Sequence, residues 1–321
     1  MKMLINTVLA LLLASCLMAC SGQNEAESNP KDAQAYLDRG IAHGQRGEFD
    51  QAIADFNRAL ELNPKEAKTY LWRGIAYGKK GNSDQEIADY TRALEINPKF
   101  SEAYSNRGAT YEQKGDLDRA IKDYTRSLEL NPKFAPAYFN RGHAYSKKGD
   151  PDRALEDYTR ALELNPKFAG AHSNRSAVYL GIGDYDRALA DANRALELNP
   201  NFAEAYLNRG EAYGRKGELD RAIADFSKTL ELIPKSAEAF NDRGFAYFKK
   251  GEMDRAIEDY NKALEINPNY GQAHYNKAEV LDRAGKKKEA IEAYQSFLKY
   301  SPPKDRGRIQ RAQERIKALE K

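Results

Sequence analysis

Residues 101–134 read SEAYSNRGATYEQKGDLDRAIKDYTRSLELNPKF, and close variants of this stretch fill most of the remaining chain. Two marker residues recur every 34 residues without an insertion. The prolines are Pro64, Pro98, Pro132, Pro166, Pro200, Pro234, Pro268 and Pro302, and the glycines are Gly47, Gly81, Gly115, Gly149, Gly183, Gly217, Gly251 and Gly285. A fixed period of this length is typical of a repeat array. With Ala33 as position 1, the eight units span 33–66, 67–100, 101–134, 135–168, 169–202, 203–236, 237–270 and 271–304.

Each unit predicts two helices joined by a tight turn. In the third unit Tyr104, Gly108 and Tyr111 occupy positions 4, 8 and 11, which share one face of a helix. Positions 20, 21, 24 and 28 form a second apolar face, and Asn-Pro ends the second helix. Gly115 suits a left-handed residue at the end of the first helix. A mid-helix glycine costs about 1 kcal/mol relative to alanine, so we expect the second helix to approach the first closely at position 8.

The composition is that of a soluble, helix-rich protein. Of the 321 residues 31% are charged, and the formal net charge is +3, with neither sign forming a block. A nucleic-acid binder usually carries a concentrated basic stripe, so nucleic acid is not an expected partner. The two cysteines, Cys16 and Cys20, both lie near the start of the chain. The repeats therefore contain no disulfide, thiol nucleophile or cysteine metal site.

The N-terminus has the layout of a secretory signal. After Met1 and Lys2, residues 3–18 are almost wholly apolar, and the polar run SGQNEAESNP comes next at residues 21–30. The apolar run is shorter than the ~20 residues that a membrane span needs. A short positive start, an apolar core and a polar sequel are typical of a signal peptide. We predict a signal peptide at 1–19 and a flexible tether at 20–32.

The end of this signal resembles the bacterial lipoprotein box. In Leu17-Met18-Ala19-Cys20 a small residue precedes a cysteine, which in that family is acylated and becomes the first mature residue. The resemblance implies a lipid anchor at Cys20, and Ser21 resembles lipoproteins sorted to an outer membrane, facing the periplasm. The overlapping Leu13-Ala14-Ser15-Cys16 is an alternative box, and an ordinary secretory signal is a third interpretation.

The repeated unit resembles the tetratricopeptide repeat. The resemblance covers residues 33–304 and rests on the 34-residue length, aromatic positions 4, 11 and 24, small positions 8, 20 and 27, and proline at 32. It implies an all-α, right-handed α-α superhelix (a solenoid) whose first helices line the concave face. Residues 305–321 place Ile309, Ala312, Ile316 and Leu319 on one stripe, which predicts a capping helix.

Two polar positions depart from the family's pattern together. Position 7 is Arg39, Arg73, Arg107, Arg141, Arg175, Arg209 and Arg243, and position 23 is Asp55, Asp89, Asp123, Asp157, Asp191, Asp225 and Asp259. The eighth unit loses both, with Lys277 and Ala293. We predict a structural Arg–Asp bridge between the two helices of each of the first seven units. A basic ladder for binding a ligand is the alternative.

No residue set in the repeats predicts catalysis. The histidines are His43, His143, His172 and His274, and most stand where other units have an aromatic residue. A lone histidine does not make a metal site, and the glycines recur with the repeat rather than forming a phosphate-binding loop. We therefore expect no enzymatic activity, no cofactor, no metal and no small-molecule substrate.

The groove side of the first helices predicts peptide binding. Position 6 is asparagine in four consecutive units, and an amide can both donate to and accept from an extended backbone. These residues are Asn106, Asn140, Asn174 and Asn208, and the eighth unit has Asn276 at the same position. The run resembles the asparagine ladder of the repeat region of O-linked N-acetylglucosamine transferases. Hydrogen bonds to helix neighbours are the alternative role.

Four aromatic residues are further candidate ligand contacts. Trp72 replaces asparagine at position 6 of the second unit, and Phe245, Phe248 and Tyr275 gather in units seven and eight. Aromatic anchors flanked by polar residues are typical of binding hot spots. The alternative is that the last three pack on the next unit or on the capping helix. The fifth unit is unusual in carrying Ser176, Ala192 and the turn Gly181-Ile182-Gly183.

The sequence thus predicts a membrane-anchored scaffold or adaptor that binds a protein or an extended peptide in its concave groove. The alternative is a regulatory or targeting subunit of a separate envelope enzyme or assembly machine, such as one for pili, outer-membrane proteins or proteolysis. The charged residues on the groove side carry both signs, so a ligand of strongly single charge is not indicated.

Overall fold

A computed structural model of the protein describes residues 32–302 and 305–321. The predicted signal peptide, Cys20 and all but the last residue of the tether lie outside the described residues, as do the last two residues of the eighth unit. Within the described part, no helix combines the length and apolar character needed to cross a membrane.

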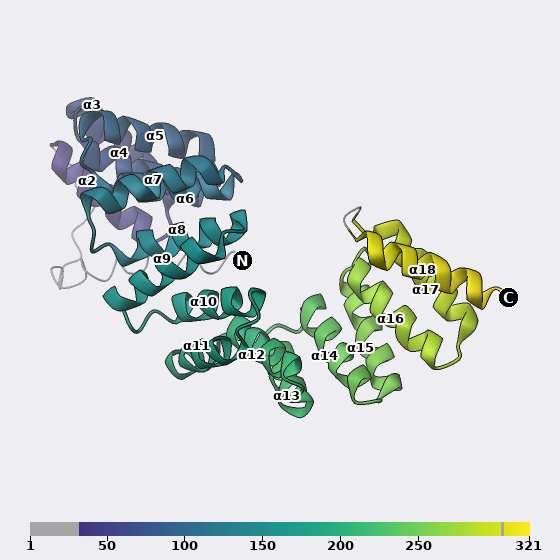
Figure 1. Ribbon diagram of the computed structural model, residues 1–321. Helices are drawn as coiled ribbons and strands as arrows, with labels where there is room; N and C mark the ends of the chain where they lie inside the picture. Colours follow the sequence, from purple (N-terminus) through teal and green to yellow (C-terminus); the bar gives the residue numbers. More distant parts are fainter. Residues whose placement is uncertain (1–31, 303–304) are drawn as a thin grey trace. The chain divides into compact units, whose positions relative to one another are not determined.

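The described residues form seventeen α-helices, which are labelled in Figure 1. They fall into two compact bodies. The N-terminal body ends at Lys167 and contains α2 (Ala33–Gln45), α3 (Phe49–Leu62), α4 (Ala67–Lys79), α5 (Ser83–Ile96), α6 (Ser101–Gln113), α7 (Leu117–Leu130), α8 (Ala135–Lys148) and α9 (Pro151–Leu164). The C-terminal body begins at Phe168 and contains α10 (Ala169–Gly181), α11 (Tyr185–Leu198), α12 (Ala203–Arg215), α13 (Leu219–Leu232), α14 (Ala237–Lys249), α15 (Met253–Ile266), α16 (Gly271–Arg283), α17 (Lys287–Tyr300) and α18 (Arg306–Leu319).

The helices form eight hairpins, each made of an even-numbered first helix and an odd-numbered second helix, and α18 comes after them. The third hairpin shows how the sequence ends and restarts a helix. Gly115 adopts φ 82°, a left-handed conformation that glycine reaches without strain. Asp116 then caps α7, because its side chain accepts a hydrogen bond of 3.0 Å from the backbone N–H of Arg119.

The two helices of a hairpin meet closely at position 8, as the sequence predicts. A methyl group added to Gly108 would lie 3.0 Å from the ring of Tyr124 and 3.2 Å from the carbonyl oxygen of Ala120. Ala120 and Tyr124 are fully buried beneath it. The glycine is therefore retained because the aromatic ring of α7 occupies the space that a side chain would need.

The fifth hairpin solves the same packing problem differently. It has Ser176 at position 8 and Ala192 at position 24, so position 8 gains a side chain where position 24 has lost its aromatic ring. Both are fully buried, and Ser176 Oγ donates a hydrogen bond of 2.8 Å to the carbonyl oxygen of Ala188. The serine fits at position 8 because the alanine at position 24 leaves the space that an aromatic ring takes in the other units.

Arginine at position 7 and aspartate at position 23 form a two-pronged ion pair in each of the first seven hairpins. In the fourth, Arg141 Nε and Nη2 donate to the two carboxylate oxygens of Asp157, both at 2.8 Å. The aspartates are buried and the arginines half-buried. The pairs are Arg39–Asp55, Arg73–Asp89, Arg107–Asp123, Arg141–Asp157, Arg175–Asp191, Arg209–Asp225 and Arg243–Asp259. Because two nitrogens of each guanidinium bind the aspartate, these arginines have a structural role and do not form a basic ladder for a ligand.

The same arginines also reach the preceding hairpin, a contact that the repeat pattern does not predict. Arg107 Nη1 donates to Thr91 Oγ1 at 3.0 Å, and Arg141 Nη1 donates to Thr125 Oγ1 at 3.1 Å. Position 25 supplies the acceptor in other hairpins too, through Asn57, Asn193 and Ser227. Each such guanidinium therefore joins three helices from two adjacent hairpins.

Packing between adjacent hairpins places the first helices on the inner side of each body. Within a body, each second helix packs on the first helix of the next hairpin, as α7 does on α8. The first helices also contact one another, as α10 does α12 and α14 does α16. The groove side of a body is therefore the face formed by its row of first helices.

Helix α18 covers the end of the eighth hairpin, as the sequence predicts for a capping helix. Ala312 is fully buried, and Ile309, Ile316 and Leu319 pack on a cluster that includes Tyr275 and Phe297. Arg315 makes two hydrogen bonds to Asp282, at 2.7 and 2.8 Å. Apolar packing and this ion pair together fix the helix on α16 and α17.

Candidate binding site on the first helices

The asparagines at position 6 differ in what their amides contact. In the C-terminal body, Asn208 Nδ2 donates to the carbonyl oxygen of Ser173 at 2.9 Å and lies 3.3 Å from its hydroxyl. Asn276, only 4% exposed, donates to Asn241 Oδ1 at 2.9 Å and accepts from Gln272. These amides connect adjacent first helices, so Asn208 and Asn276 have a structural role in the packing of the hairpins.

Two position-6 residues keep polar groups unused. In the N-terminal body, Asn106 Nδ2 and Trp72 Nε1 are buried without a hydrogen-bond partner among the described residues. Trp72 is half-buried against the cluster of the first hairpin. Asn140 and, in the C-terminal body, Asn174 are half-buried. A buried donor without an acceptor costs about 1–3 kcal/mol, and because these two nitrogens are buried, a ligand carbonyl does not reach them in this arrangement of the side chains.

The structure separates the three aromatic residues of units seven and eight, and two of them do not line the groove. Phe248 is 8% exposed and packs with Ala256, Tyr260 and Val280. Tyr275 is 5% exposed, with its ring centre 4.9 Å from that of Phe297. The prediction that Phe248 and Tyr275 are ligand contacts is therefore corrected: the next hairpin and the capping end of the body bury them.

Phe245, by contrast, is exposed on the groove side of α14. Its relative exposure is 41%, and the ammonium group of Lys249 lies 5.3 Å from the centre of the ring. A large exposed ring beside a cation is a common element of a protein-binding surface. Of the three aromatic candidates in this region, only Phe245 is available to a partner.

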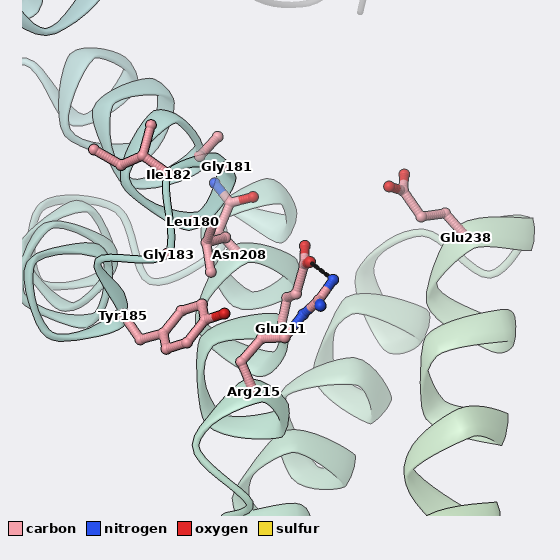
Figure 2. A pocket seen from close by; sticks show the side chains of 10 residues that line it. Leu180, Gly181, Ile182, Gly183, Tyr185, Asn208, Glu211, Arg215 and Glu238 are labelled. Carbon is pink, nitrogen blue, oxygen red and sulfur yellow. Dashed lines mark hydrogen bonds and ion pairs between the residues drawn. The ribbon is translucent and has the colours of Figure 1, made fainter. Parts of the chain in front are cut away.

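An open pocket of about 590 Å³ lies on the groove side of the C-terminal body, on α10, α12 and α14 (Figure 2). Its apolar side is made by Ala177, Leu180, Ile182 and Tyr185. Its polar side is made by Asn208, Glu211, Arg215 and Glu238. This volume lies within the range of about 300–1,000 Å³ that small-ligand pockets have, so the pocket can accept one or two side chains of a peptide.

Glycine at position 13 of the fifth unit keeps this pocket open. The other units have glutamine, lysine or arginine there, including Arg215 and Lys249 in the next two. A methyl group added to Gly181 would meet nothing within 4 Å. Packing therefore does not require the glycine, and a long side chain at this position would instead fill the space. The unusual turn is visible in the sequence, but the pocket beside it becomes visible only in the structure.

The polar side of the pocket carries excess negative charge. Glu211 accepts a hydrogen bond of 3.1 Å from Arg215, whereas Glu238 has no ion-pair partner among the described residues. Partial desolvation and then the charge of Glu211 raise the pKa of Glu238. Asp242 lies one turn further along α14; burial and, to a lesser degree, Glu238 and Glu211 raise its pKa to about 7, although a hydrogen bond from Asn241 opposes the shift.

The histidines make local contacts rather than a shared site. His172 lies 2.9 Å from Asp191, His143 lies 2.7 Å from Glu112, and His43 lies 2.6 Å from Glu48. No cluster of three or more potential metal ligands occurs in the part of the chain that the structure describes.

The described chain is a series of helix pairs whose first helices leave one face open on the groove side. This arrangement defines an all-α repeat protein. Family models described as "Tetratricopeptide repeat" match residues 67–100, 101–134, 135–168, 157–190, 177–237, 237–270 and 259–292, and one described as "TPR repeat" matches 43–81. These matches run without a gap from residue 43 to 292, well over half of the chain. The chain belongs to the tetratricopeptide repeat family, whose members generally mediate protein–protein interactions and are typically not catalytic.

Solved structures support the fold. The chain is similar to one in the APC/C hetero-tetramer Cut9–Hcn1, with a TM-score of 0.67 and 20% identity over 84% of this chain and 52% of that one, so it spans about half of that chain's length. It is also similar to a tetratricopeptide repeat protein from Parabacteroides merdae ATCC 43184, with a TM-score of 0.62 and 20% identity over 79% and 99% of the two chains. Similarity to PilF of Pseudomonas aeruginosa has a TM-score of 0.60 and 19% identity over 64% and 94%. A search of curated proteins found no match.

Proposed function

We propose that this protein is a non-enzymatic scaffold that holds an extended peptide, or an extended segment of a partner protein, along its row of first helices. The observation that carries the proposal is the set of groups on that face that folding leaves unused. These are the pocket of about 590 Å³ and the exposed ring of Phe245. Proteins of this family generally act by protein–protein interaction, and the pocket and the exposed ring support the proposal that the first helices take part in it.

Affinity capture from a solubilised cell envelope tests this proposal. One groove variant carries alanine at Asn106, Asn140, Asn174 and Asn208, and a second carries Phe245→Ala alone. We expect both to lose a partner that the unaltered protein captures. The matched control carries alanine at four exposed glutamates on second helices, Glu95, Glu129, Glu163 and Glu197.

Phe245→Ala is the more specific test of ligand contact, because it removes no hydrogen bond between helices. Asn208→Ala also removes the hydrogen bond to Ser173, whereas Phe245 is exposed and its truncation leaves the core intact. Capture that survives both groove variants, or is lost equally in the control, would contradict binding along the first helices. A stoichiometric enzyme among the captured proteins would instead support a regulatory or targeting subunit.

We further propose that the scaffold is anchored to a bacterial membrane by acylation of Cys20, and that it faces the periplasm from the outer membrane. The support is the apolar run of residues 3–18 and the small residue before Cys20. One acyl chain binds a membrane only marginally, and stable anchoring takes at least two. Mass spectrometry of the mature N-terminus should find an acylated Cys20. Cys20→Ser should release the protein from membranes, while Cys16→Ser should not, and the opposite pattern would assign the anchor to Cys16.

A further inference from the structure

The pocket on α10, α12 and α14 has two chemically different sides. Figure 2 shows Ile182 and Tyr185 on one side and Glu238 on the other, with the Glu211–Arg215 pair between them. We propose that this pocket selects a peptide segment in which an aliphatic or aromatic side chain stands next to a lysine or arginine. The proposal rests on the peptide-binding function proposed above and specifies the ligand for one part of it.

The apolar side is a specific property of the fifth hairpin. Ile182 is 48% exposed, and the next two hairpins have Lys216 and Lys250 at the equivalent position. Leu180 stands where the next hairpin has Gly214. Exposed aliphatic side chains that line a concavity favour burial against an apolar ligand group. Ile182 and Leu180 therefore form an apolar surface on which one apolar side chain of the ligand can pack.

The acidic side lacks a full set of counter-charges. Glu211 and Glu238 face the pocket with a single basic residue, Arg215, which pairs with Glu211. This pair is exposed, with side-chain exposures of 61% for Arg215 and 43% for Glu211, and pairs of that kind are weak. A lysine or arginine of a ligand can therefore bind Glu238 directly and compete with Arg215 for Glu211.

The raised pKa values of Glu238 and Asp242 agree with this polarity. Negative charge is unfavourable at both carboxyl groups, because desolvation and, to a lesser degree, neighbouring acids oppose their ionisation. A cation placed in the pocket beside Glu238 and Glu211 would relieve the repulsion between these two carboxylates, whereas a carboxylate or phosphate would increase it. The pocket should therefore reject acidic peptides even when their apolar residues fit.

Fluorescence anisotropy with three labelled synthetic peptides tests the proposal on the full-length protein in detergent. The peptides are GSLKLKSG, its glutamate counterpart GSLELESG and its serine counterpart GSSKSKSG. We expect the leucine–lysine peptide to bind at least about tenfold more tightly than the other two, because only it satisfies both sides of the pocket. Its affinity should fall as salt is added, since the pair with Glu238 is screened.

Two variants with matched controls assign the binding to the pocket. Glu238→Gln should weaken the leucine–lysine peptide by roughly 3- to 10-fold, and Ile182→Lys should weaken it by at least about tenfold. The controls, Glu265→Gln and Ile266→Lys, place the same changes at exposed positions on α15 outside the pocket. All four sites are exposed, so circular dichroism should show unchanged folding.

The outcomes separate this inference from the broader proposal. Equal affinity for the three peptides, no effect of Glu238→Gln and Ile182→Lys, or equal effects of the controls would overturn the inference. If capture from the envelope still depended on Phe245 in that case, the scaffold function would stand without this ligand preference. If capture were also independent of the first helices, both proposals would fail.

Discussion

A single guanidinium at position 7 joins three helices of two adjacent hairpins. Arg141 binds both oxygens of Asp157 and, through its remaining nitrogen, Thr125 of the preceding hairpin. Only arginine has the planar fork that this arrangement needs, because lysine offers one point charge. Asp157 is 4% exposed at its side chain, so removing its partner would leave a buried charge.

We predict that Arg141→Ala lowers the free energy of unfolding by about 3 kcal/mol, since a buried carboxylate loses its counter-charge. Arg141→Lys should recover only part of this loss. The measurement is urea denaturation followed by circular dichroism. The control is Arg160→Ala, which breaks an exposed pair with Glu163 and should cost less than about 1 kcal/mol. Equal losses in the two variants would contradict a structural role for the bridge.

Asp242 predicts a pH dependence with a definite sign. Its pKa of about 7 in the folded protein exceeds the ordinary value of 3.8, so between these values the folded state holds a proton that the unfolded state has lost. The resulting stabilisation is complete below pH 3.8 and is lost as pH rises through 7. Asp242→Asn, which restores the asparagine of other units, should remove this contribution.

The comparison needed is between pH 5 and pH 8. We expect the unaltered protein to lose on the order of 1–3 kcal/mol more stability over this interval than Asp242→Asn does. Other groups titrate in the same range, so the difference between the two proteins is the relevant quantity. Parallel pH profiles would mean that Asp242 ionises normally in the folded state.

At the scale of the helix pair, the fifth hairpin offers a test of compensating substitutions. Ser176 occupies the site that is glycine in most units, and Ala192 vacates the site of the aromatic ring. Ala192→Tyr alone should therefore destabilise the hairpin by about 1–3 kcal/mol through overpacking. Adding Ser176→Gly should recover most of that loss, because Gly108 and Tyr124 show that the pair fits. Thermal unfolding of the single and double variants measures this, and equal melting temperatures would contradict the steric account.

Helix pairing could be predicted from sequence because its determinants lie within one unit. Arginine at position 7 and aspartate at position 23 are 16 residues apart in each of the first seven units, as Arg107 and Asp123 are, and their joint loss in the eighth unit indicates contact. The repeat pattern does not predict the bond from Arg107 to Thr91, because position 25 varies among threonine, asparagine and serine. A repeat pattern reveals a contact only when the residue types on both sides of it stay constant.

The candidate site could be predicted only in part, because the exposure of a groove residue depends on the neighbouring hairpin as well as on its own unit. Tyr275 and Phe248 occupy groove positions of the repeat, yet the capping end of the body covers the first and Val280 helps to cover the second. Asn208 was expected to face a ligand, but the acceptor it found is Ser173 of the preceding unit. The pocket beside Gly181 lies where the fifth unit lacks a long side chain, and a pattern of residue types does not indicate the space that is left.

At the scale of the molecule, stability should be local. Within each body, the substantial helix contacts are confined to a hairpin and its neighbours. Such arrays behave as a sum of units and interfaces, so damage in one unit spreads only as far as the coupling between neighbours. A lesion in one body should therefore leave the distant hairpins of the other protected.

Hydrogen–deuterium exchange with two matched lesions tests this. Gly108→Val forces a side chain against Tyr124 in the N-terminal body, and Gly244→Val does the same against Tyr260 in the C-terminal body. We expect the first to raise exchange in α4–α9 while leaving α14–α18 as they are, and the second to raise exchange in α12–α18 while leaving α2–α5 as they are. Because partial opening costs less than global unfolding, the affected amides should also differ from those exposed in urea. Uniform loss of protection along the chain in either variant would instead mean that the repeats unfold as one cooperative unit.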